Sequence, residues 1–399
     1  MKHTLCVVTG SRAEFGILLP LLRRLQDCPE IELRLAVTGS HLSAAYGHTV
    51  DEIKNSGLPI SVQLPLPLEE NCGKVGMAKA TAAAMDAFAE YFSQHRPELM
   101  LVLGDRYEVF AASAAAAMLG IPIAHLHGGE TTEGAVDEFF RHSVTKMSYL
   151  HFTACEAYRR RVIQLGEAPG RVFNVGALGI ENVLHTPLLS QGELEESLGF
   201  ALTAKPYCIV TFHPVTMEEH TAAKQFNQLT AAMEAFPNMN YLITKANADA
   251  GGQEINAMWE QAAVERKNWF VTASLGMRRY LSAMRGCLMV LGNSSSGILE
   301  APAMHIPTVN IGDRQKGRMR AESIIDCPPE REAICAAMER AMTPAFRHIA
   351  AHTVSPFGDG NTSERILAEL LYFLRHRPES LQKAFYDLPV TISEGPGKQ

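Results

Sequence analysis

Short apolar segments alternate with longer helical patterns along most of this chain. In the first half we expect strands at 5–8, 33–38, 60–64, 99–103, 121–125, 150–153 and 172–175, with helices between them such as 14–25, 75–92 and 156–165. A second set of strands is expected at 208–212, 241–244, 269–272, 288–291 and 308–311. Nearly continuous apolar strands joined by helices are typical of parallel sheets covered on both faces. Because crossovers are right-handed, the pattern predicts an α/β fold of two doubly wound, Rossmann-like domains.

The length of 399 residues agrees with two domains. A polar segment near 190–205 separates the two sets of strands, so we expect an N-terminal domain over 1–185 and a C-terminal domain over 186–361. A helical pattern at 362–374 and a polar tail follow, and we expect 362–399 to pack back on the N-terminal domain. Ligands of open α/β sheets bind at the carboxyl ends of the strands, so we expect an active-site cleft between the domains.

Composition excludes several classes of protein. With 36 basic and 43 acidic side chains, the formal net charge of −7 argues against an extended nucleic-acid surface but allows a local anion pocket. No segment approaches the roughly 18 apolar residues that span a membrane, and the N-terminus lacks a secretory pattern. The eight cysteines are scattered without a C-x-x-C pair. We therefore expect a cytoplasmic protein with no membrane partner and with reduced thiols.

The first strand ends in the segment TGSRAEFG, where Gly10 closes a tight turn into a helix. Backbone N–H groups at that helix start, with Arg12 beside them, would suit an anion. A plain glycine turn with a surface arginine is the alternative. G-x-G-x-x-G is missing, which disfavours NAD and FAD, and no cofactor is expected. The phosphate-binding and serine-nucleophile motifs G-x-x-x-x-G-K-[ST] and G-x-S-x-G are missing too.

The second domain carries a phosphate-like pattern, LGNSSSGILEAP. Three hydroxyl side chains and a glycine at a helix start predict a donor-rich diphosphate cradle, and Glu300 one turn later would accept two ribose hydroxyls. A serine-capped helix with a solvated glutamate is the alternative. Arg314 in the basic loop DRQKGRMR and His213 after another strand are candidates to lie near the phosphates. A solvated basic face is the alternative for the loop, and a structural role suits His213 equally. The cradle residues are Ser294, Ser295, Ser296 and Gly297.

Acidic side chains gather after strands of the first domain. They are Asp105 in LGDRYE, Glu130 in HLHGGE and Asp137 in VDEFFRH, with Arg106 and Arg141 close in sequence. Carboxylates brought to one sheet edge have their pKa values pushed apart, which suits acid–base chemistry. For Asp137, a helix first-turn acid is the alternative.

His125 and His127 alternate on one expected strand and would share a face with Glu130 nearby. Such a group could bind a divalent ion, but a third histidine or cysteine at ligand spacing is absent from the pattern. Hydrogen bonding to a sugar suits these side chains equally, and we expect no metal.

With these motifs, the chain closely resembles the bacterial hydrolysing UDP-N-acetylglucosamine 2-epimerases of sialic-acid biosynthesis, and more distantly the epimerase half of the animal bifunctional epimerase/kinase. The resemblance covers nearly the whole chain and runs through VTGSRAEFG, LGDRYE, HLHGGE, DEFFRHSVTKMS, FHP, NADAG, GNSSSG and NIGDRQKGR. It implies a GT-B type enzyme that cleaves UDP-N-acetylglucosamine to UDP and N-acetylmannosamine. UDP would leave by anti elimination, a base would take the proton from carbon 2, and water would add across 2-acetamidoglucal.

The resemblance also implies roles for single residues. Asp105 and Asp137 match acidic positions implicated in catalysis, while Arg106 and Asn247 match positions that contact the ligand. The animal motif E-G-G-E reads H-G-G-E here, so either His127 or Glu130 takes the third acid–base role, or they share it. The set expected to hold the nucleotide is Arg12, Ser294, Ser295 and Arg314 on the diphosphate, Glu300 on the ribose and His213 near the diphosphate.

The substrate stays open within the resemblance, because relatives in legionaminic-acid pathways use N,N'-diacetylbacillosamine carried on UDP or GDP. More distant alternatives are a non-hydrolysing epimerase, a GT-B glycosyltransferase and a non-catalytic nucleotide-sugar sensor. The resemblance further implies a homo-oligomer, either a dimer or a tetramer.

Overall fold

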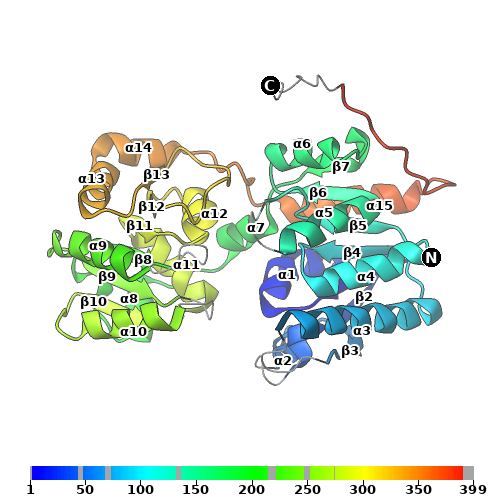
Figure 1. Cartoon of the computed structure of the whole chain (residues 1–399), viewed down its shortest axis with the longest axis horizontal. Coiled ribbons are helices and arrows are strands. Elements are labelled where there is room, and N and C mark those ends of the chain that lie inside the picture. The colour runs from blue at the N-terminus through cyan, green and yellow to red at the C-terminus, as the bar shows by residue number, and fades with distance from the viewer. Residues whose placement is uncertain are drawn as a thin grey trace, which may run out of the picture. The chain divides into compact units, whose positions relative to one another are not determined.

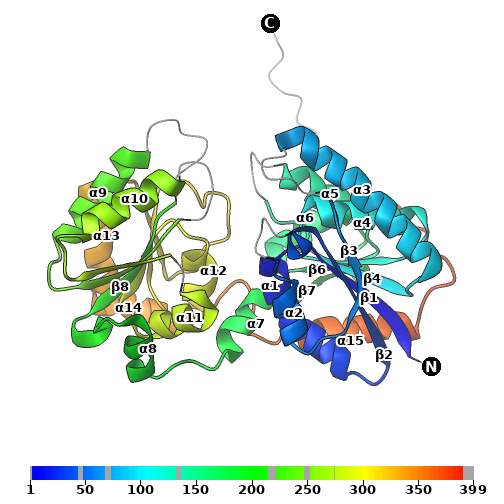
Figure 2. The ribbon, with the colours of Figure 1, turned by 90° about the horizontal axis from the view of Figure 1, so that it is seen from below.

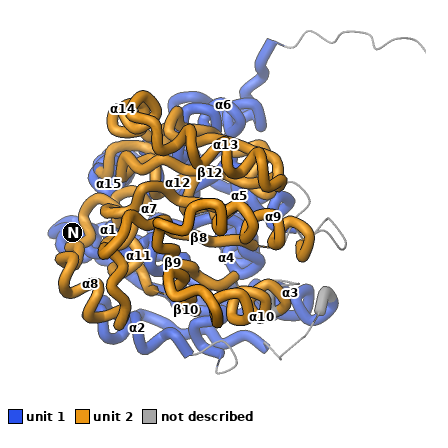
Figure 3. The backbone as a smooth tube through the Cα atoms, turned by 90° about the vertical axis from the view of Figure 1, so that its left-hand side faces the viewer, with its two compact units in different colours: residues 1–178, 361–399 blue, residues 179–360 orange. Residues whose placement is uncertain are grey.

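The chain divides into two units, each built on its own parallel sheet (Figure 1). The computed structural model describes residues 2–43, 48–67, 73–131, 136–213, 222–246, 252–273 and 275–389. Unit 1 comprises Met1–Leu178 and Asn361–Gln399, and unit 2 comprises Gly179–Gly360, as coloured in Figure 3. The helix α7 (Leu178–His185) belongs almost entirely to unit 2, whereas the first domain was expected to end at residue 185.

The sheet of unit 1 has the strand order β3-β2-β1-β4-β5-β6-β7, and all of its pairings are parallel. This is the order of a doubly wound sheet, in which the chain reverses direction across the sheet between β1 and β4. The strands are β1 (His3–Thr9), β2 (Ile31–Thr38), β3 (Ile60–Leu64), β4 (Leu99–Leu103), β5 (Ile123–Leu126), β6 (Leu150–Thr153) and β7 (Val172–Asn174).

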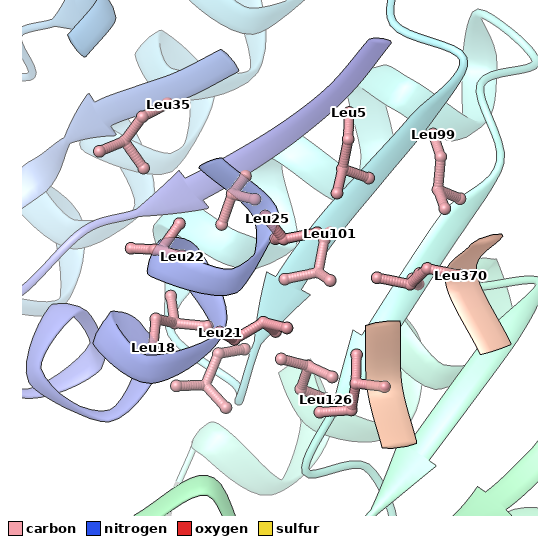
Figure 4. Packing of buried hydrophobic residues seen from close by; sticks show 14 of the residues in the cluster. Leu5, Leu18, Leu21, Leu22, Leu25, Leu35, Leu99, Leu101, Leu126 and Leu370 are labelled. Carbon is pink, nitrogen blue, oxygen red and sulfur yellow. The ribbon is translucent and has the colours of Figure 1, made fainter. Parts of the chain in front are cut away.

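Helices cover both faces of this sheet because alternate strand residues point to opposite sides (Figure 2). Leu5 and Val7 of β1 pack with α1 and α15, whereas Cys6 and Val8 pack with α3 and α4. In Figure 4, Leu370 of α15 approaches the same side of the sheet as the leucines of α1. The helices of unit 1 are α1 (Arg12–Asp27), α2 (Val50–Asn55), α3 (Gly73–Gln94), α4 (Tyr107–Met118), α5 (Asp137–Met147), α6 (Glu156–Gln164) and α15 (Thr362–Arg375).

Unit 2 repeats the same winding with the order β10-β9-β8-β11-β12-β13, again parallel throughout. Its strands are β8 (Tyr207–Thr211), β9 (Asn240–Thr244), β10 (Trp269–Thr272), β11 (Met289–Gly292), β12 (Thr308–Ile311) and β13 (Ile324–Cys327). Besides α7, its helices are α8 (Gln191–Leu198), α9 (Ala222–Glu234), α10 (Gly252–Ala263), α11 (Gly276–Gly286), α12 (Ser296–Ala303), α13 (Arg331–Met342) and α14 (Pro344–His352).

The fold class expected from the sequence is confirmed, since both units are doubly wound α/β sheets. Every expected strand is present within a few residues of its expected bounds, and β13 is the strand that the pattern missed. β13 is a short edge strand that carries the exposed Asp326 among Ile324, Ile325 and Cys327, so its apolar run is interrupted. No helix in the described part of the chain has the length and apolar character needed to cross a membrane.

The C-terminal segment beyond α15 runs along unit 1 and is fastened there by Lys383. Its ammonium group donates to both carboxylate oxygens of Glu167, each at 2.9 Å, and to the backbone oxygen of Ser148 at 2.6 Å. Tyr386 adds a backbone hydrogen bond from its N–H to the carbonyl of Gly166 at 2.9 Å. Residues 376–389, called the C-terminal strap below, therefore pack against unit 1 near the end of α5 and the turn after α6.

Candidate active site

Each sheet has a point at which its strand order reverses, between β1 and β4 in unit 1 and between β8 and β11 in unit 2. In open α/β sheets, ligands bind outside the carboxyl ends of the strands at such points. Gly10 and Asp105 follow β1 and β4, and His213 and Asn293 follow β8 and β11. Asp105 and His213, both predicted from the sequence, therefore lie at the strand ends where doubly wound sheets bind their ligands.

Arg141 joins the acidic side chains of unit 1. It lies on α5 and is only 4% exposed. One of its terminal nitrogens pairs with the carboxylate of Asp105 after β4. The other donates to Glu138 Oε2 at 2.8 Å and to the backbone oxygen of Glu130 at 3.0 Å. One buried guanidinium thus connects the end of β4, the segment after β5 and the start of α5.

This environment perturbs Asp105. Burial raises the pKa of the Asp105 carboxyl, Arg141 opposes that rise, and the neighbouring charges of Asp137 and Glu130 add to it. Asp137 is exposed at the first position of α5. The three acids predicted from sequence therefore lie within electrostatic reach of one another. A carboxyl whose pKa is raised in this way is suited to exchanging protons.

His127 pairs with Glu130, its Nδ1 lying 2.9 Å from Glu130 Oε1. The backbone of His127 has a φ of +63°, so the chain leaves the strand at Leu126, the last residue of β5. Nε2 of His127 is buried and has no hydrogen-bond partner among the described residues. The imidazole and the carboxylate therefore form a coupled pair at the same edge as Asp105.

The expectation that His125 and His127 share a strand face is wrong, because His127 lies outside β5. His125 is fully buried, with Nε2 2.8 Å from the backbone oxygen of Gly104 and Nδ1 3.2 Å from the hydroxyl of Thr145. Burial lowers the pKa of His125 to about 3, so the ring is neutral at ordinary pH. Both of its nitrogens are used in hydrogen bonds, which leaves it no role as a metal ligand.

The turn after β1 differs from the expected anion site. The N–H groups of Gly10 and Ser11 both donate to Glu14 Oε2, at 2.8 and 3.0 Å, in a capping box at the start of α1. Arg12 projects outward with 70% of its side chain exposed and pairs with Glu52 at 2.9 Å. The donors expected to bind an anion are therefore occupied by the chain's own carboxylate.

In unit 2, Asn293 links the ends of β8 and β11. Its side chain accepts from the N–H of His213 at 2.7 Å and donates to the His213 carbonyl at 2.8 Å. The backbone oxygen of Asn293 accepts from Arg314 Nη1 at 3.0 Å and from Gln315 Nε2 at 2.8 Å. His213 and Arg314, both expected near the diphosphate, are thus brought together through Asn293, which sequence reasoning had not selected.

The predicted cradle lies at the start of α12. Ser295 precedes the helix, Ser296 is its first residue, and the N–H of Ser296 donates to Ser294 Oγ at 3.3 Å. Ser296 Oγ, Glu300 Oε2 and the hydroxyl of Tyr280 on α11 are buried near one another at the start of α12. Burial raises the pKa of Glu300, while Ser296 and Arg318 oppose the rise. Buried polar side chains therefore gather around Glu300, and they include Tyr280, which sequence reasoning did not select because it lies on another helix.

Gly297 serves packing in addition to any role in the cradle. A β-carbon at this position would lie 2.7 Å from the methyl group of Thr308, because α12 packs directly on β12. Gly292 is more constrained still, since its φ is +130° and a β-carbon there would lie 2.0 Å from the carbonyl oxygen of Thr211. Only glycine therefore fits at the end of β11, where the chain turns into the loop that carries Asn293. In the sequence, its position at the end of an expected strand was the feature that could have identified it.

The basic loop lines a cavity of about 640 Å³ beside the ends of β12 and β13. Arg320 pairs with Asp326 at 3.1 Å, and Lys316 lies 3.6 Å from Asp313. Arg318 also lines this cavity. Asn247, expected to contact the ligand, lies outside the described residues.

The chain matches known proteins over nearly its full length. The family model described as UDP-N-acetylglucosamine 2-epimerase matches residues 23–371. Polysialic acid biosynthesis protein P7 of Escherichia coli is 38% identical, covering 96% of this chain and 97% of that protein. The hydrolysing GDP/UDP-N,N'-diacetylbacillosamine 2-epimerase of Campylobacter jejuni is 37% identical, covering 82% and 84%. The hydrolysing UDP-N,N'-diacetylbacillosamine 2-epimerase of Legionella pneumophila is 35% identical, covering 92% and 94%.

Among solved structures, the UDP-GlcNAc 2-epimerase of Neisseria meningitidis bound to UDP-GlcNAc superposes with a TM-score of 0.77 at 17% identity, covering 92% of this chain and 100% of that one. At that identity, the likeness speaks for the fold alone. The sequence relatives and the family model confirm the resemblance inferred from the motifs. The chain belongs to the UDP-N-acetylglucosamine 2-epimerase family.

Proposed function

We propose that the chain is a hydrolysing 2-epimerase that converts UDP-N-acetylglucosamine and water to N-acetylmannosamine and UDP. The observation that carries this proposal is its identity of 37% and 35% with two relatives named as hydrolysing 2-epimerases. The relative from polysialic acid biosynthesis, at 38% identity, favours the N-acetylglucosamine donor.

The proposed chemistry follows from the acidity of carbon 2. A carboxylate cannot remove that proton until positive charge has developed at carbon 1, so the diphosphate must begin to leave first. We assign the stabilisation of the leaving diphosphate to the hydroxyl groups of Ser294 and Ser295 with His213 and Arg314, and we assign the ribose to Glu300. Arg12 stays a weaker candidate, because it is exposed and paired with Glu52.

Proton transfer is assigned to the acidic edge of unit 1. The raised pKa of Asp105, caused mainly by burial, supports a carboxyl that gains and loses a proton during the cycle. Asp137 and the His127–Glu130 pair supply the remaining acid and base for elimination and for hydration of the glucal. The distance of 2.9 Å between His127 Nδ1 and Glu130 Oε1 favours a shared role over a choice between them. We propose that the acidic residues of unit 1 and the nucleotide-binding residues of unit 2 serve one reaction.

The test is turnover of UDP-N-acetylglucosamine in deuterium oxide, followed by proton NMR. We expect UDP and free N-acetylmannosamine that carries deuterium at carbon 2. UDP-N-acetylmannosamine without free hexosamine would instead identify a non-hydrolysing epimerase. Free sugar without deuterium at carbon 2 would refute the elimination.

A second substrate is favoured by the names of the Campylobacter and Legionella relatives. If UDP-N-acetylglucosamine is inert while UDP- or GDP-linked N,N'-diacetylbacillosamine is turned over, the enzyme belongs to the diacetamido-sugar branch. Comparing kcat/KM for the three donors under one condition distinguishes these cases. We also propose that the protein forms a dimer or a tetramer and that it is cytoplasmic. The comparison of donors does not depend on either proposal.

A further inference from the structure

Asn293, directly after β11, lies where the backbone pairing of β8 and β11 ends. The last paired residues are Gly292 and Thr211, and the N–H of Asn293 still donates to the backbone oxygen of Thr211 at 3.1 Å. At Gly292 the chain turns with a φ of +130°, so the backbone of β11 leaves β8 at this point. The regular pairing of the two strands therefore ends before it reaches His213.

The side chain of Asn293 continues this pairing. Its Oδ1 accepts from the N–H of His213 at 2.7 Å, and its Nδ2 donates to the backbone oxygen of His213 at 2.8 Å. Asn293 is 1% exposed and His213 is 6% exposed, and backbone polar groups buried to this extent are costly to leave unpaired. A carboxamide offers an acceptor and a donor side by side, as a peptide group does. Asn293 therefore holds both polar groups of the His213 backbone.

The main chain of Asn293 contacts a third strand end. Its backbone oxygen accepts from Arg314 Nη1 at 3.0 Å and from Gln315 Nε2 at 2.8 Å, both in the loop after β12. The two sets of contacts are therefore made by different groups, since the side chain holds His213 and the backbone oxygen holds the loop of Arg314. A substitution of the side chain removes the first set and keeps the oxygen that makes the second.

Asn293 is not itself suited to bind a ligand. The residue is buried, and both polar atoms of its side chain are engaged with His213. The side chain is also uncharged, whereas a carboxylate at this position would oppose the binding of an anion beside Arg314. Its shape and its lack of charge fit a role in holding neighbouring groups.

We propose that Asn293 is a positioning residue whose side chain holds His213 in the place from which the imidazole contacts the leaving diphosphate, together with Arg314. This inference rests on the proposed function, which assigns His213 and Arg314 to the diphosphate. It goes beyond that function by naming the side chain on which the location of His213 depends. It assigns Asn293 no contact with substrate.

A double-mutant cycle tests the proposal. N293A, H213A and N293A/H213A are compared by calorimetry for the Kd of the nucleoside diphosphate, UDP or GDP, that binds the wild type. We expect each single variant to lose at least about tenfold in affinity. The double variant should match H213A within about twofold, because a residue that acts only through His213 has no further effect once the imidazole is gone.

The corresponding nucleoside provides a readout that a general loss of structure would not reproduce. Because it lacks the diphosphate, its Kd in N293A, measured by ligand-observed NMR, should change less than about threefold. Equal losses for the nucleoside and the nucleoside diphosphate would show that Asn293 supports the fold of unit 2 in general, and would overturn the inference.

N240A is the matched control. Asn240 is also buried in unit 2, at 5% exposure, and its Nδ2 donates to the backbone oxygen of Leu202 at 2.8 Å. It is the first residue of β9 and therefore lies at the amino edge of the sheet, opposite to the edge that carries His213. N240A should lower the free energy of unfolding of unit 2, followed by the fluorescence of its two tryptophans, and leave the Kd unchanged.

N293D keeps the test decisive if N293A fails to fold. The aspartate retains an acceptor for the N–H of His213 but loses the donor to its backbone oxygen, so the affinity should again fall at least about tenfold. An unchanged Kd in N293A or N293D would overturn the inference. Multiplicative losses in the double variant would do so too, because they would show that Asn293 does not act through His213. A wild-type chain that binds neither diphosphate and turns over none of the three donors would instead refute the proposed function, which is a distinguishable outcome.

Discussion

Replacing Glu167 with glutamine should destabilise unit 1 in a manner that depends on pH. The Glu167 side chain is 1% exposed and accepts from Lys146 at 2.7 Å, from Lys383 at 2.9 Å and from His151 at 3.1 Å. Arg171 lies 3.9 Å away. One buried carboxylate thus holds together α5, β6 and the C-terminal strap.

The expected magnitude comes from proton linkage. Burial alone would raise the pKa of Glu167, but hydrogen bonds from His151, Lys146 and Lys383 lower it to about 2, against 4.5 for an ordinary glutamate. This difference corresponds to about 3 kcal/mol, because a tenfold change in proton affinity is about 1.4 kcal/mol. Since the folded-state pKa is depressed, the contribution is complete above pH 4.5 and is lost as the pH falls towards 2. E167Q should therefore lower the free energy of unfolding of unit 1 by about 3 kcal/mol at pH 7.

Two optical signals separate the units in a urea titration. Both tryptophans of the chain, Trp259 and Trp269, lie in unit 2, so their fluorescence reports that unit alone, whereas circular dichroism reports both. E167Q should shift the part of the dichroism transition that has no fluorescence counterpart. Cleavage of the strap by a protease should also become faster, because Lys383 loses its carboxylate partner.

An unchanged dichroism transition at pH 7 would contradict this reasoning. A loss of the same size at pH 7 and at pH 3 would contradict it too, since it would mean that glutamine disturbs packing and that the charge of Glu167 contributes nothing. K205Q is a suitable control, because Lys205 in unit 2 is exposed and donates to the backbone oxygen of Pro237 at 3.5 Å.

Three other changes have defined outcomes. The pKa of Glu14 is raised to about 7 by burial, so its contribution to stability is greatest below pH 4.5 and is lost as the pH rises through 7; E14Q should remove a decline of about 3 kcal/mol across that range in dichroism-monitored urea unfolding. G297A should lower the free energy of unfolding of unit 2, followed by fluorescence, by about 1 to 3 kcal/mol through contact with Thr308, whereas G192A, whose added methyl group meets open space, should not. D105N should retain UDP affinity in calorimetry and lose at least about a hundredfold in kcat, and a near-normal kcat would remove Asp105 from the mechanism.

The sequence by itself determined the architecture of this protein. Apolar strands such as 99–103 and 208–212 alternate with helical patterns. Because every residue of such a strand is apolar, both of its faces must be buried, which is typical of a parallel sheet with helices on each side. The local order of apolar and polar residues is enough to predict this architecture, because it shows which side chains are buried when the chain folds. It also located the strand ends, and hence Asp105, His127 and Ser294, since the parallel strands of each sheet place their carboxyl ends at one edge.

Only the tertiary structure decided which partner each polar group takes. Arg141 reaches Asp105 across 36 residues of chain, and Lys383 reaches Glu167 across 216. The contact of Glu14 with the N–H groups after β1 is different in kind, because it is a local capping box between residues three and four positions apart. Hydrogen bonds and ion pairs depend on distances of a few ångströms between segments remote in sequence, and a local pattern of residues carries no such distances.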